Sequence, residues 1–440
     1  MNTLNETHQP SLRSWLSSAN VPDTDFPIQN LPYGRFRRLS VDEPWRIGIA
    51  IGDCILDLQR VEAKQIAPEN IQQCLQPLAA GHLNGFMSLG FAQWHAMRQF
   101  ISSILRVDSV HQAVVADCLV AQAQAEMTLP CEIGDYTDFF TSIHHASNIG
   151  KLFRPGENPL LPNYQWVPIG YHGRSSSIVV NASDIQRPVG QILPTGTSEP
   201  ILSPSKRLDM ELELGIFIGQ GNARGTHIPI EKSEEHVFGI CLLNDWSARD
   251  IQTWEYQPLG PFLSKSFSTS ISPWIVTLEA LAPYRLPFSR PKDDPQPLPY
   301  LDSEKNRSEG AFDIQLEVLI QTSLMRQEKQ APTRICKTNY QHAYWTIAQL
   351  VAHHTINGCN LRCGDLFGSG TLSGPTLDQA GALIELTWGG KAPLILPNGE
   401  QRVFLEDGDL ILLKGWCEKS GATRIGFGEC QGIITAAISV

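Results

Sequence analysis

Short apolar runs with a period of two dominate the chain after residue 130, and this pattern predicts β-strands. Glycine and proline turns separate the runs at irregular intervals. One helical pattern, at residues 341–354, interrupts them. Strands and helices do not alternate regularly, so the pattern favours a mainly β fold, a sandwich or rolled sheet, over a Rossmann fold. The predicted strands cover residues 177–180, 210–218, 237–243, 274–278, 312–321, 384–387, 403–405, 410–413 and 432–438.

The first part of the chain has a different pattern. Residues 45–58 alternate like two strands joined by a tight turn, and residues 68–124 have apolar positions at helical spacing. Pro130 breaks the helical pattern just before an acidic segment begins. We therefore predict two domains, residues 1–127 and residues 128–440.

Composition places the chain among ordinary globular proteins. Its 440 residues, 42% hydrophobic and 18% charged, are enough to bury a large core. A net charge of −11 argues against nucleic-acid or anionic-membrane partners, because both require a basic surface. The first residues lack the basic and apolar segments of a secretion signal, and no run of about 18 apolar residues follows. We expect a cytoplasmic protein with its ten scattered cysteines reduced and mostly buried.

Acidic residues at metal-ligand spacing extend from residue 135 to residue 269. If residues 210–218 form a strand, its period of two places Glu211 and Glu213 on one face. Two such carboxylates repel each other unless a cation lies between them, although a solvated outer face would explain the same alternation. Asp245 ends an apolar run, where it is either a helix N-cap or a third metal ligand beside Asp138. Oxygen ligands of this kind favour Ca²⁺ or Mg²⁺ over zinc.

Titratable and cationic side chains accompany these carboxylates. His144 and His145 are adjacent, and either is a packed, a surface or a functional histidine; His172 is an equal candidate by spacing. Lys265 stands in a turn-rich stretch between aromatic residues, where most lysines are exposed. Carboxylates beside an imidazole and a lysine indicate an enzyme that holds a hard cation next to a proton-transfer group. If a helical turn follows Asp245, three polar residues share one of its faces: Arg249, Gln252 and Tyr256.

Longer strings along essentially the whole chain resemble the fumarylacetoacetate hydrolase family. Several of them are specific to the full-length hydrolases of this family, which carry an N-terminal domain that shorter relatives lack. The strings are DFPIQNLPYG (25–34), RIGIAIGD (46–53), DYTDFFTSIHHASNIG (135–150), GYHGRSSS (170–177), LDMELELGIFIG (208–219), NDWSARDIQ (244–252), EYQPLGPFLSKSFSTSISPW (255–274), NGCNLRCGDLFGSGTLSGP (357–375) and FLEDGDLILLKGW (404–416).

The resemblance implies a fold and an activity. The fold is mainly β (α+β), with a small N-terminal SH3-like β-barrel domain followed by a larger C-terminal mixed β-sandwich roll, assembled as a homodimer. The activity is the metal-dependent hydrolysis of a carbon–carbon bond in 4-fumarylacetoacetate, a small-molecule substrate, at the last step of tyrosine and phenylalanine catabolism.

The resemblance also implies roles for particular residues. His145 is the general base and Glu385 orients it, with Lys265 and Arg249 in the same catalytic pocket. Ca²⁺ is held by Asp138, Glu211, Glu213 and Asp245, and an Mg²⁺-type site is formed by Lys265 and Thr269. The implied substrate contacts are Phe140, Arg154, Tyr171, Gln252, Tyr256 and Thr371. The family often has tyrosine where this chain has Phe140, so we expect one substrate hydrogen bond, worth about 1 kcal/mol, to be missing.

Two alternatives remain beside this interpretation. The first is an acylpyruvate or other β-diketone hydrolase or decarboxylase on the same metal platform, which a panel of small substrates would distinguish. The second is a metal-stabilised protein without catalytic activity. The presence of His145, Glu385 and Lys265 together argues against the second alternative.

Overall fold

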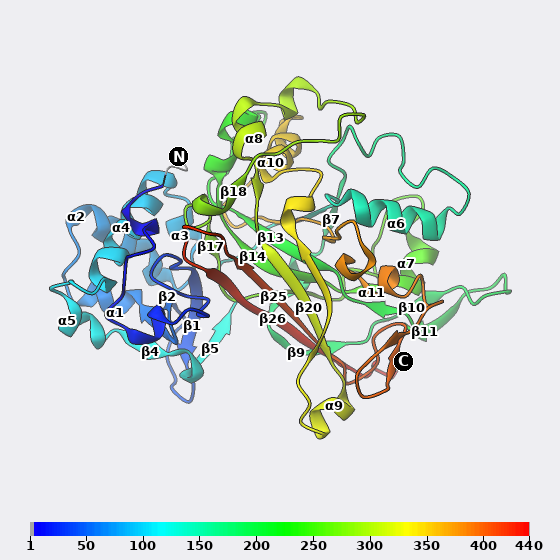
Figure 1. Cartoon of the computed structure of the whole chain (residues 1–440), viewed down its shortest axis with the longest axis horizontal. Coiled ribbons are helices and arrows are strands. Elements are labelled where there is room, and N and C mark those ends of the chain that lie inside the picture. Colours follow the sequence, from blue (N-terminus) through cyan, green and yellow to red (C-terminus); the bar gives the residue numbers. More distant parts are fainter. Residues whose placement is uncertain (1–3, 440) are drawn as a thin grey trace.

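The computed structural model describes residues 4–439, and its fold is mainly β in an α+β arrangement. Figure 1 shows a smaller N-terminal part, coloured blue to cyan, beside a larger part that contains two extended sheets. Within residues 4–439, no helix has the length and apolar character needed to span a bilayer. All ten cysteines are free thiols, and Cys54, Cys359 and Cys363 are the ones that are only half-buried.

An antiparallel five-stranded sheet forms the centre of the N-terminal part, and the predicted pair of strands at residues 45–58 is confirmed within it. The predicted domain boundary, after residue 127, falls inside strand β5 (Ala125–Thr128), which pairs with β1 (Tyr33–Arg38). The strand order is β4 (Leu119–Ala121), β3 (Cys54–Asp57), β2 (Arg46–Ile51), β1 (Tyr33–Arg38) and β5 (Ala125–Thr128). The helices are α1 (Leu58–Ala63), α2 (Glu69–Leu75), α3 (Asn84–Met87), α4 (Phe91–Leu105) and α5 (Gln112–Ala116).

A mixed eight-stranded sheet, the central sheet, carries most of the acidic segment. Its strands run in the order β7 (Gly170–Gly173), β6 (Tyr136–Phe139), β22 (Leu366–Gly368), β13 (Leu212–Ile218), β14 (Val237–Asp245), β16 (Thr269–Ile271) and β8 (Ile178–Val180), with β17 (Val276–Thr277) also paired to β14. The pairs β6–β22 and β16–β8 are parallel, and the others are antiparallel.

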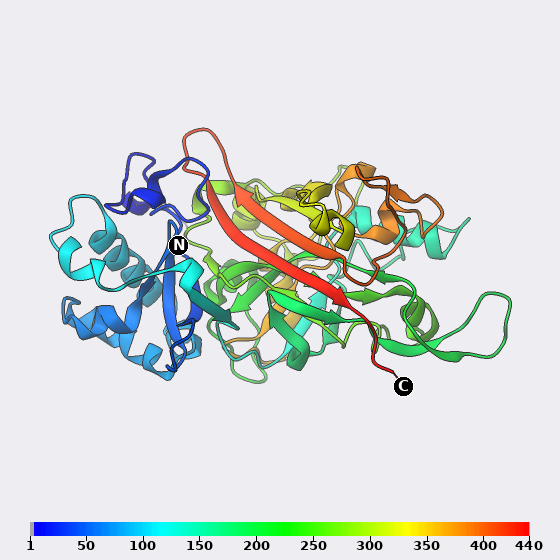
Figure 2. The same ribbon diagram turned by 90° about the horizontal axis from the view of Figure 1, so that it is seen from below.

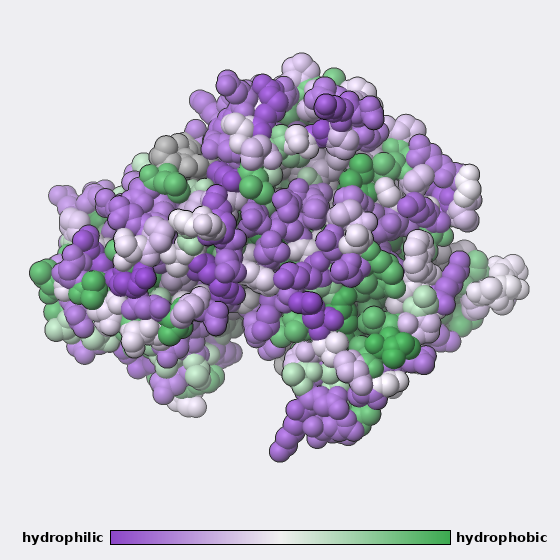
Figure 3. Space-filling model, in the orientation of Figure 1, coloured by the Kyte–Doolittle hydropathy of each residue, from purple (hydrophilic) through white to green (hydrophobic). Residues whose placement is uncertain are grey.

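A second sheet of five strands, the outer sheet, lies in front of the central sheet in Figure 1. Seen from below in Figure 2, its last long strand crosses the front of the molecule toward the C-terminus. Its exposed face carries mostly hydrophilic residues, with hydrophobic residues gathered toward the end nearest the C-terminus (Figure 3). The order is β21 (Thr333–Asn339), β20 (Gln315–Gln321), β25 (Leu410–Cys417), β26 (Ile425–Thr435) and β9 (Ala182–Gln186).

The central sheet is buried on both faces because alternate residues of its strands pack in opposite directions. On β14, Ile240 and Leu242 join the core shared with the outer sheet, whereas Cys241 and Leu243 join the core shared with the N-terminal part. A polar side chain on this sheet is therefore away from water unless it lies where the strands end.

Short strand pairs and helices complete the larger part. The pairs are β10 (Val189–Ile192) with β11 (Ile201–Pro204), β12 (Leu208–Asp209) with β15 (Ser247–Ala248), β18 (Arg285–Leu286) with β19 (Ala311–Phe312), and β23 (Leu394–Ile395) with β24 (Gln401–Arg402). The helices are α6 (Ile143–Phe153), α7 (Arg249–Glu255), α8 (Glu304–Glu309), α9 (Ser323–Gln327), α10 (Ile347–Thr355) and α11 (Leu383–Leu386).

Three local predictions are corrected by the structure. Residues 384–387, predicted as a strand, lie mostly in helix α11, and residues 403–405 follow β24 without forming a strand. The predicted helix at 341–354 is instead a 3₁₀ turn followed by α10, which begins at Ile347. The turn ends at His342, and Thr346 caps α10 in a capping box with Gln349, so the helix start is fixed locally.

Candidate active site

Three carboxylates meet at the end of the central sheet. Asp138 on β6, Glu213 on β13 and Asp245 at the end of β14 are buried, and each offers an oxygen within 4.8 Å of the others. Strand pairing brings them together, since β22 lies between β6 and β13. At Gly368 on β22 a Cβ atom would stand 2.4 Å from Asp138 Oδ1 and 2.9 Å from Glu213 Oε2, so the missing side chain makes room for both carboxylates.

Two carboxylate oxygens of this cluster have no hydrogen-bond donor among the described residues, which suits a bound cation. Asp138 Oδ1 and Glu213 Oε1 are buried without a hydrogen-bond donor among the described residues. Burial raises the pKa of Asp138 and of Glu213 well above the usual range, and neighbouring carboxylates raise both further. Oxygen ligands at this separation fit a hard divalent ion, so the residues present suit a metal centre.

Glu211 stands beside the cluster and contacts two cations. Lys265 Nζ donates to Glu211 and, at 2.7 Å, to Asp245 Oδ2, while Arg249 Nη2 lies 2.8 Å from Glu211 Oε1. Burial acts to raise the pKa of Glu211, but Arg249, Lys265 and His145 together hold it well below its usual range. The alternative that Glu211 and Glu213 form a solvated outer face is therefore wrong: they are 4% and 0% exposed.

The lysine is also more buried than its loop position suggested. Lys265 is 6% exposed, and although burial lowers its pKa, Asp245 and Glu211 raise the pKa above its usual value, so it remains a cation. Thr269 Oγ1 donates to Asp245 Oδ1 at 3.2 Å, and Tyr171 OH donates to Asp245 Oδ2 at 3.0 Å. A cleft of about 220 Å³ reaches this side of the cluster.

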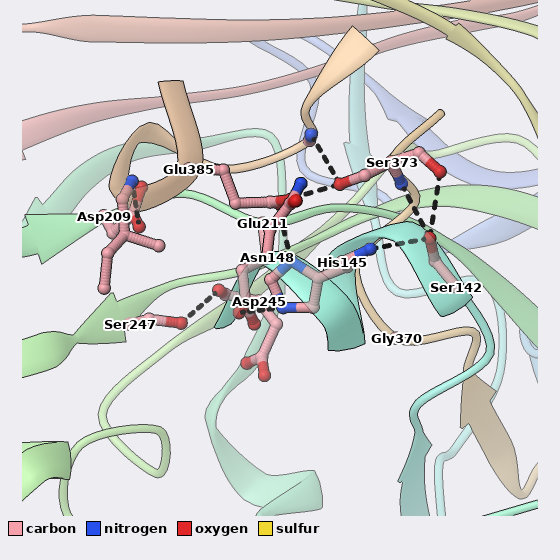
Figure 4. Close-up of polar contacts among 12 residues, drawn as sticks. Ser142, His145, Asn148, Asp209, Glu211, Asp245, Ser247, Gly370, Ser373 and Glu385 are labelled. Atoms are coloured by element: carbon pink, nitrogen blue, oxygen red, sulfur yellow. Dashed lines mark hydrogen bonds and ion pairs between the residues drawn. The ribbon is translucent and has the colours of Figure 1, made fainter. Parts of the chain in front are cut away.

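A histidine–glutamate pair faces the carboxylates from the other side. His145 Nδ1 lies 2.6 Å from Glu385 Oε1, and His145 Nε2 lies 3.8 Å from Glu211 Oε1 (Figure 4). Because Glu385 accepts from Nδ1–H, the lone pair of Nε2 points toward the cluster. His145 is 3% exposed; His144, by contrast, is half-buried against His342, and His172 is exposed, so neither is placed like His145.

Further polar groups fix Glu385. Asn148 Nδ2 donates to Oε2 at 2.8 Å, and Ser373 Oγ donates to Oε1 at 2.8 Å. Burial acts to raise the pKa of Glu385, but His145 and these donors keep it lower than usual, so the carboxylate stays ionised. Ser142 caps helix α6 by accepting from the His145 backbone N–H at 3.2 Å.

The residues implied as substrate contacts lie at differing distances from this centre. Phe140 presents its ring edge-on to His145 at 5.5 Å between centroids, and Arg249 Nη1 donates to Gln252 at 3.1 Å. Thr371 is buried in the loop after β22. Arg154 at the end of α6 donates to the Pro159 carbonyl, and Tyr256 ends α7, 38% exposed.

Sequence reasoning missed several residues that the structure places here. Asp209 accepts from Arg249 and from the start of α11, and the Gly370 N–H donates to Glu213 Oε2 at 3.0 Å. Asp209 precedes Glu211 by two residues, so the same period-two alternation would have indicated it. Asn148 and Ser373 carry no comparable signal, because their role depends on a residue more than ten positions away.

Comparisons with known proteins give one consistent result. The chain matches the family described as Fumarylacetoacetase N-terminal over residues 29–130 and the family described as Fumarylacetoacetate (FAA) hydrolase C-terminal over residues 136–434. It is 48% identical over 423 residues to the Fumarylacetoacetase of Homo sapiens, covering 94% of this chain and 97% of that protein. It is 46% identical over 439 residues to the Fumarylacetoacetase of Oryza sativa subsp. japonica, covering 98% and 99%.

Among solved structures, the chain resembles a fumarylacetoacetate hydrolase from psychrophilic Exiguobacterium antarcticum. The TM-score is 0.50 with 16% sequence identity, over 92% of this chain and 99% of that chain. At this identity the likeness concerns the fold alone.

Proposed function

Because the chain belongs to the fumarylacetoacetase family, we propose that it hydrolyses the carbon–carbon bond of 4-fumarylacetoacetate to fumarate and acetoacetate, the last step of tyrosine and phenylalanine catabolism. The observation that carries this proposal is the buried His145–Glu385 pair, whose free Nε2 faces the carboxylate cluster. A general base beside a metal centre is the equipment that hydrolysis of a β-diketone requires.

The proposed reaction begins with water. Glu385 holds the His145 ring so that Nε2 takes a proton from water, a contribution of about 10²–10⁴ in rate. The hydroxide adds to the carbonyl carbon of the fumaryl side, and the carbon–carbon bond breaks. Its electron pair leaves with the acetoacetate fragment as an enolate, to which the proton on His145 returns.

Cationic residues balance the charge of the leaving enolate. Lys265 and Arg249 are buried beside Glu211, and we assign to them, with Gln252, the stabilisation of the enolate oxygen. One such donor typically contributes about 10²–10³ in rate. We propose that Phe140, Arg154, Tyr171, Tyr256 and Thr371 contact the substrate.

We propose that Asp138, Glu211, Glu213 and Asp245 hold Ca²⁺, and that Lys265 and Thr269 mark an Mg²⁺-type site. The two buried acceptors that have no donor among the described residues, on Asp138 and Glu213, support the first assignment. A divalent cation in this position supplies Lewis-acid stabilisation of charge on the diketone oxygens.

The finer architecture is also a proposal. We take residues 1–127 as an SH3-like barrel and residues 128–440 as a β-sandwich roll, supported by the antiparallel N-terminal sheet and by the core that the central and outer sheets share. Limited proteolysis that cuts first near residue 130 would support this division, and first cuts elsewhere would argue against it. We further propose a cytoplasmic homodimer, for which light scattering should give twice the mass of the chain.

The testing experiment follows the loss of fumarylacetoacetate absorbance with purified protein, before and after chelation. Turnover that disappears with chelator and returns with Ca²⁺ or Mg²⁺ supports both the reaction and the carboxylate site. A folded, metal-loaded protein without turnover would contradict the proposal. The same protein would then be tested on acylpyruvates and other β-diketones, because the metal platform suits those substrates equally.

A further inference from the structure

Asp209 joins the two halves of the site. It ends β12, is 0% exposed, and lies beside helix α11 in Figure 4. Its Oδ2 accepts from Arg249 Nε at 2.9 Å and from the Ile384 N–H at 3.0 Å. Its Oδ1 accepts from the Leu383 N–H at 2.7 Å and from the Met210 N–H at 2.8 Å. Four donors on one buried carboxylate leave it little freedom to move.

Two of these donors are the first N–H groups of α11. Leu383 and Ile384 begin the helix, so their N–H groups have no acceptor within it. The preceding residue, Ala382, has no side-chain oxygen and makes no side-chain cap. Asp209 therefore caps α11 from a strand 174 positions away in the chain. Glu385, the partner of His145, follows one residue after Ile384, within the turn that this cap holds.

The other contact of Asp209 leads to the metal side. Arg249 uses Nε to reach Asp209 and Nη2 to reach Glu211, so its guanidinium lies between the two carboxylates. A single side chain thus connects the group that neutralises Glu211 with the helix that carries Glu385.

We infer that Asp209 is a positioning residue that sets Glu385, and through it His145, in register with the Arg249–Glu211 side of the cluster. This inference rests on the proposed function, because it concerns the same reaction. Asp209 touches neither the ring of His145 nor the cleft, so its effect is on the rate of the bound complex more than on substrate binding. Carboxylates that orient catalytic groups in this indirect way typically contribute 10–100-fold to activity.

The test uses Asp209→Asn in the full-length, metal-loaded protein. Asparagine keeps the shape but has one acceptor oxygen and no charge. It therefore cannot accept hydrogen bonds from both Arg249 and the α11 N–H groups. We expect kcat to fall about 10- to 100-fold with KM changed by less than about threefold. In a Glu385→Gln background the same substitution should cost much less, because residues that act through one another are not additive.

Asp57→Asn is the matched control. Asp57 is also 0% exposed, caps a helix by accepting from the N–H groups of Gln59 and Arg60, and binds an arginine, Arg46, at 2.6 Å. It lies in the N-terminal part, away from the site. We expect this variant to lower the melting temperature, as the loss of a buried cap does, and to leave kcat unchanged.

The outcomes separate the inference from the proposed function. If the unsubstituted protein does not hydrolyse fumarylacetoacetate, the function itself fails. If it does, and Asp209→Asn has normal kcat or costs the same in both backgrounds, the positioning role is wrong. Should Asp209→Asn not fold, amide hydrogen exchange of the unsubstituted protein decides: rapid exchange at Leu383 and Ile384 would contradict the cap, and slow exchange supports it.

Discussion

At the scale of single residues, the chemistry depends on which ring nitrogen of His145 is free. Glu385 accepts from Nδ1 at 2.6 Å, and Asn148 and Ser373 each donate to Glu385. These contacts hold the carboxylate in the orientation that binds the imidazole. The remaining nitrogen, Nε2, then points to Glu211 across 3.8 Å. Nε2 is thus the ring nitrogen that no carboxylate within residues 4–439 approaches to hydrogen-bond distance.

Replacing this base should separate chemistry from binding. We expect His145→Asn to abolish measurable turnover while Ca²⁺ affinity changes little, because the proposed metal ligands are other residues. Steady-state assay of fumarylacetoacetate loss and calorimetric titration with Ca²⁺ measure the two properties. Near-normal turnover in this variant would show that another group takes the proton. His144→Asn, whose ring faces His342, is the control and should retain activity.

A second histidine should make the fold sensitive to acid. His354 lies on α10, bonded to Thr137 Oγ1 at 3.0 Å and stacked on Phe367 at 4.9 Å. Burial, with a smaller effect from His172, lowers the pKa of His354 from 6.5 to about 4. Between these pH values the unfolded chain binds the proton and the folded chain does not, so stability falls as pH drops below 6.5 and levels off near 4.

Urea unfolding at pH 7 and pH 5 measures this effect. His354 should account for a loss on the order of 2 kcal/mol between these pH values. His354→Gln should therefore show a shallower pH dependence than the unsubstituted protein. The exposed His227, replaced in the same way, serves as the control and should leave the pH dependence unchanged. Equal slopes for the His354→Gln variant and the unsubstituted protein would contradict the assignment.

At the scale of elements, local sequence predicted those whose pattern is decided by their own residues. The alternation at residues 210–218 placed Glu213, on β13, in the carboxylate cluster, whereas Glu211 lies just before the strand and beside the cluster. Residues 384–387 also look like a strand, with a β-branched residue at each end. They form a helix instead because Asp209 supplies the cap, and a cap so distant in sequence leaves no local signal.

The roles of Glu385 and Lys265 could not be worked out from local pattern either. Lys265 belongs to a loop, where lysine is usually exposed, and its burial follows from the strands that surround it. The resemblance to known hydrolases supplied both residues before their geometry was known. Physical reasoning from the sequence alone therefore predicts a metal-dependent enzyme of β architecture. The burial and contacts of Glu385 and Lys265 depend on residues that are distant in the sequence and adjacent only in the fold.

Helix α6 should be sensitive at Gly150, one turn after His145. A Cβ atom there would lie 1.9 Å from the Pro159 carbonyl oxygen, which also accepts from Arg154 at 2.8 Å. We expect Gly150→Ala to destabilise the protein by about 1–3 kcal/mol and to raise KM, because the loop that positions Arg154 must move. Thermal unfolding and steady-state kinetics measure the two effects. Ser147→Ala, on the same helix, is the control. An unchanged KM for Gly150→Ala would show that this contact affects folding and not substrate binding.

At the scale of the whole molecule, the two sheets and the N-terminal part explain why the site can hold so much charge. The central sheet is covered on one face by the outer sheet and on the other by the N-terminal part. Its strands therefore keep Asp138, Glu213 and Asp245 out of water. Their mutual repulsion is stronger in the protein interior than it would be in water. A bound cation would offset this cost, which makes overall stability a measure of the site.

Metal binding should accordingly raise the melting temperature of the whole protein. A divalent ion that binds only the folded chain stabilises it by about 2.7 kcal/mol at a hundred times its Kd. We expect EDTA to lower Tm by several degrees and Ca²⁺ to restore it, whereas K⁺ at equal ionic strength should not. Glu213→Gln removes the charge of a central carboxylate of the proposed site without removing bulk, so its Tm should respond little to either treatment. Asp57→Asn, in the N-terminal part, should start from a lower Tm yet respond to Ca²⁺ as the unsubstituted protein does.

If neither chelator nor Ca²⁺ changes Tm, or if Glu213→Gln responds in full, these carboxylates are not the stabilising metal site. The charge at the end of the central sheet would then have to be neutralised by Lys265 and by protons, which the raised pKa values of Asp138 and Glu213 would permit.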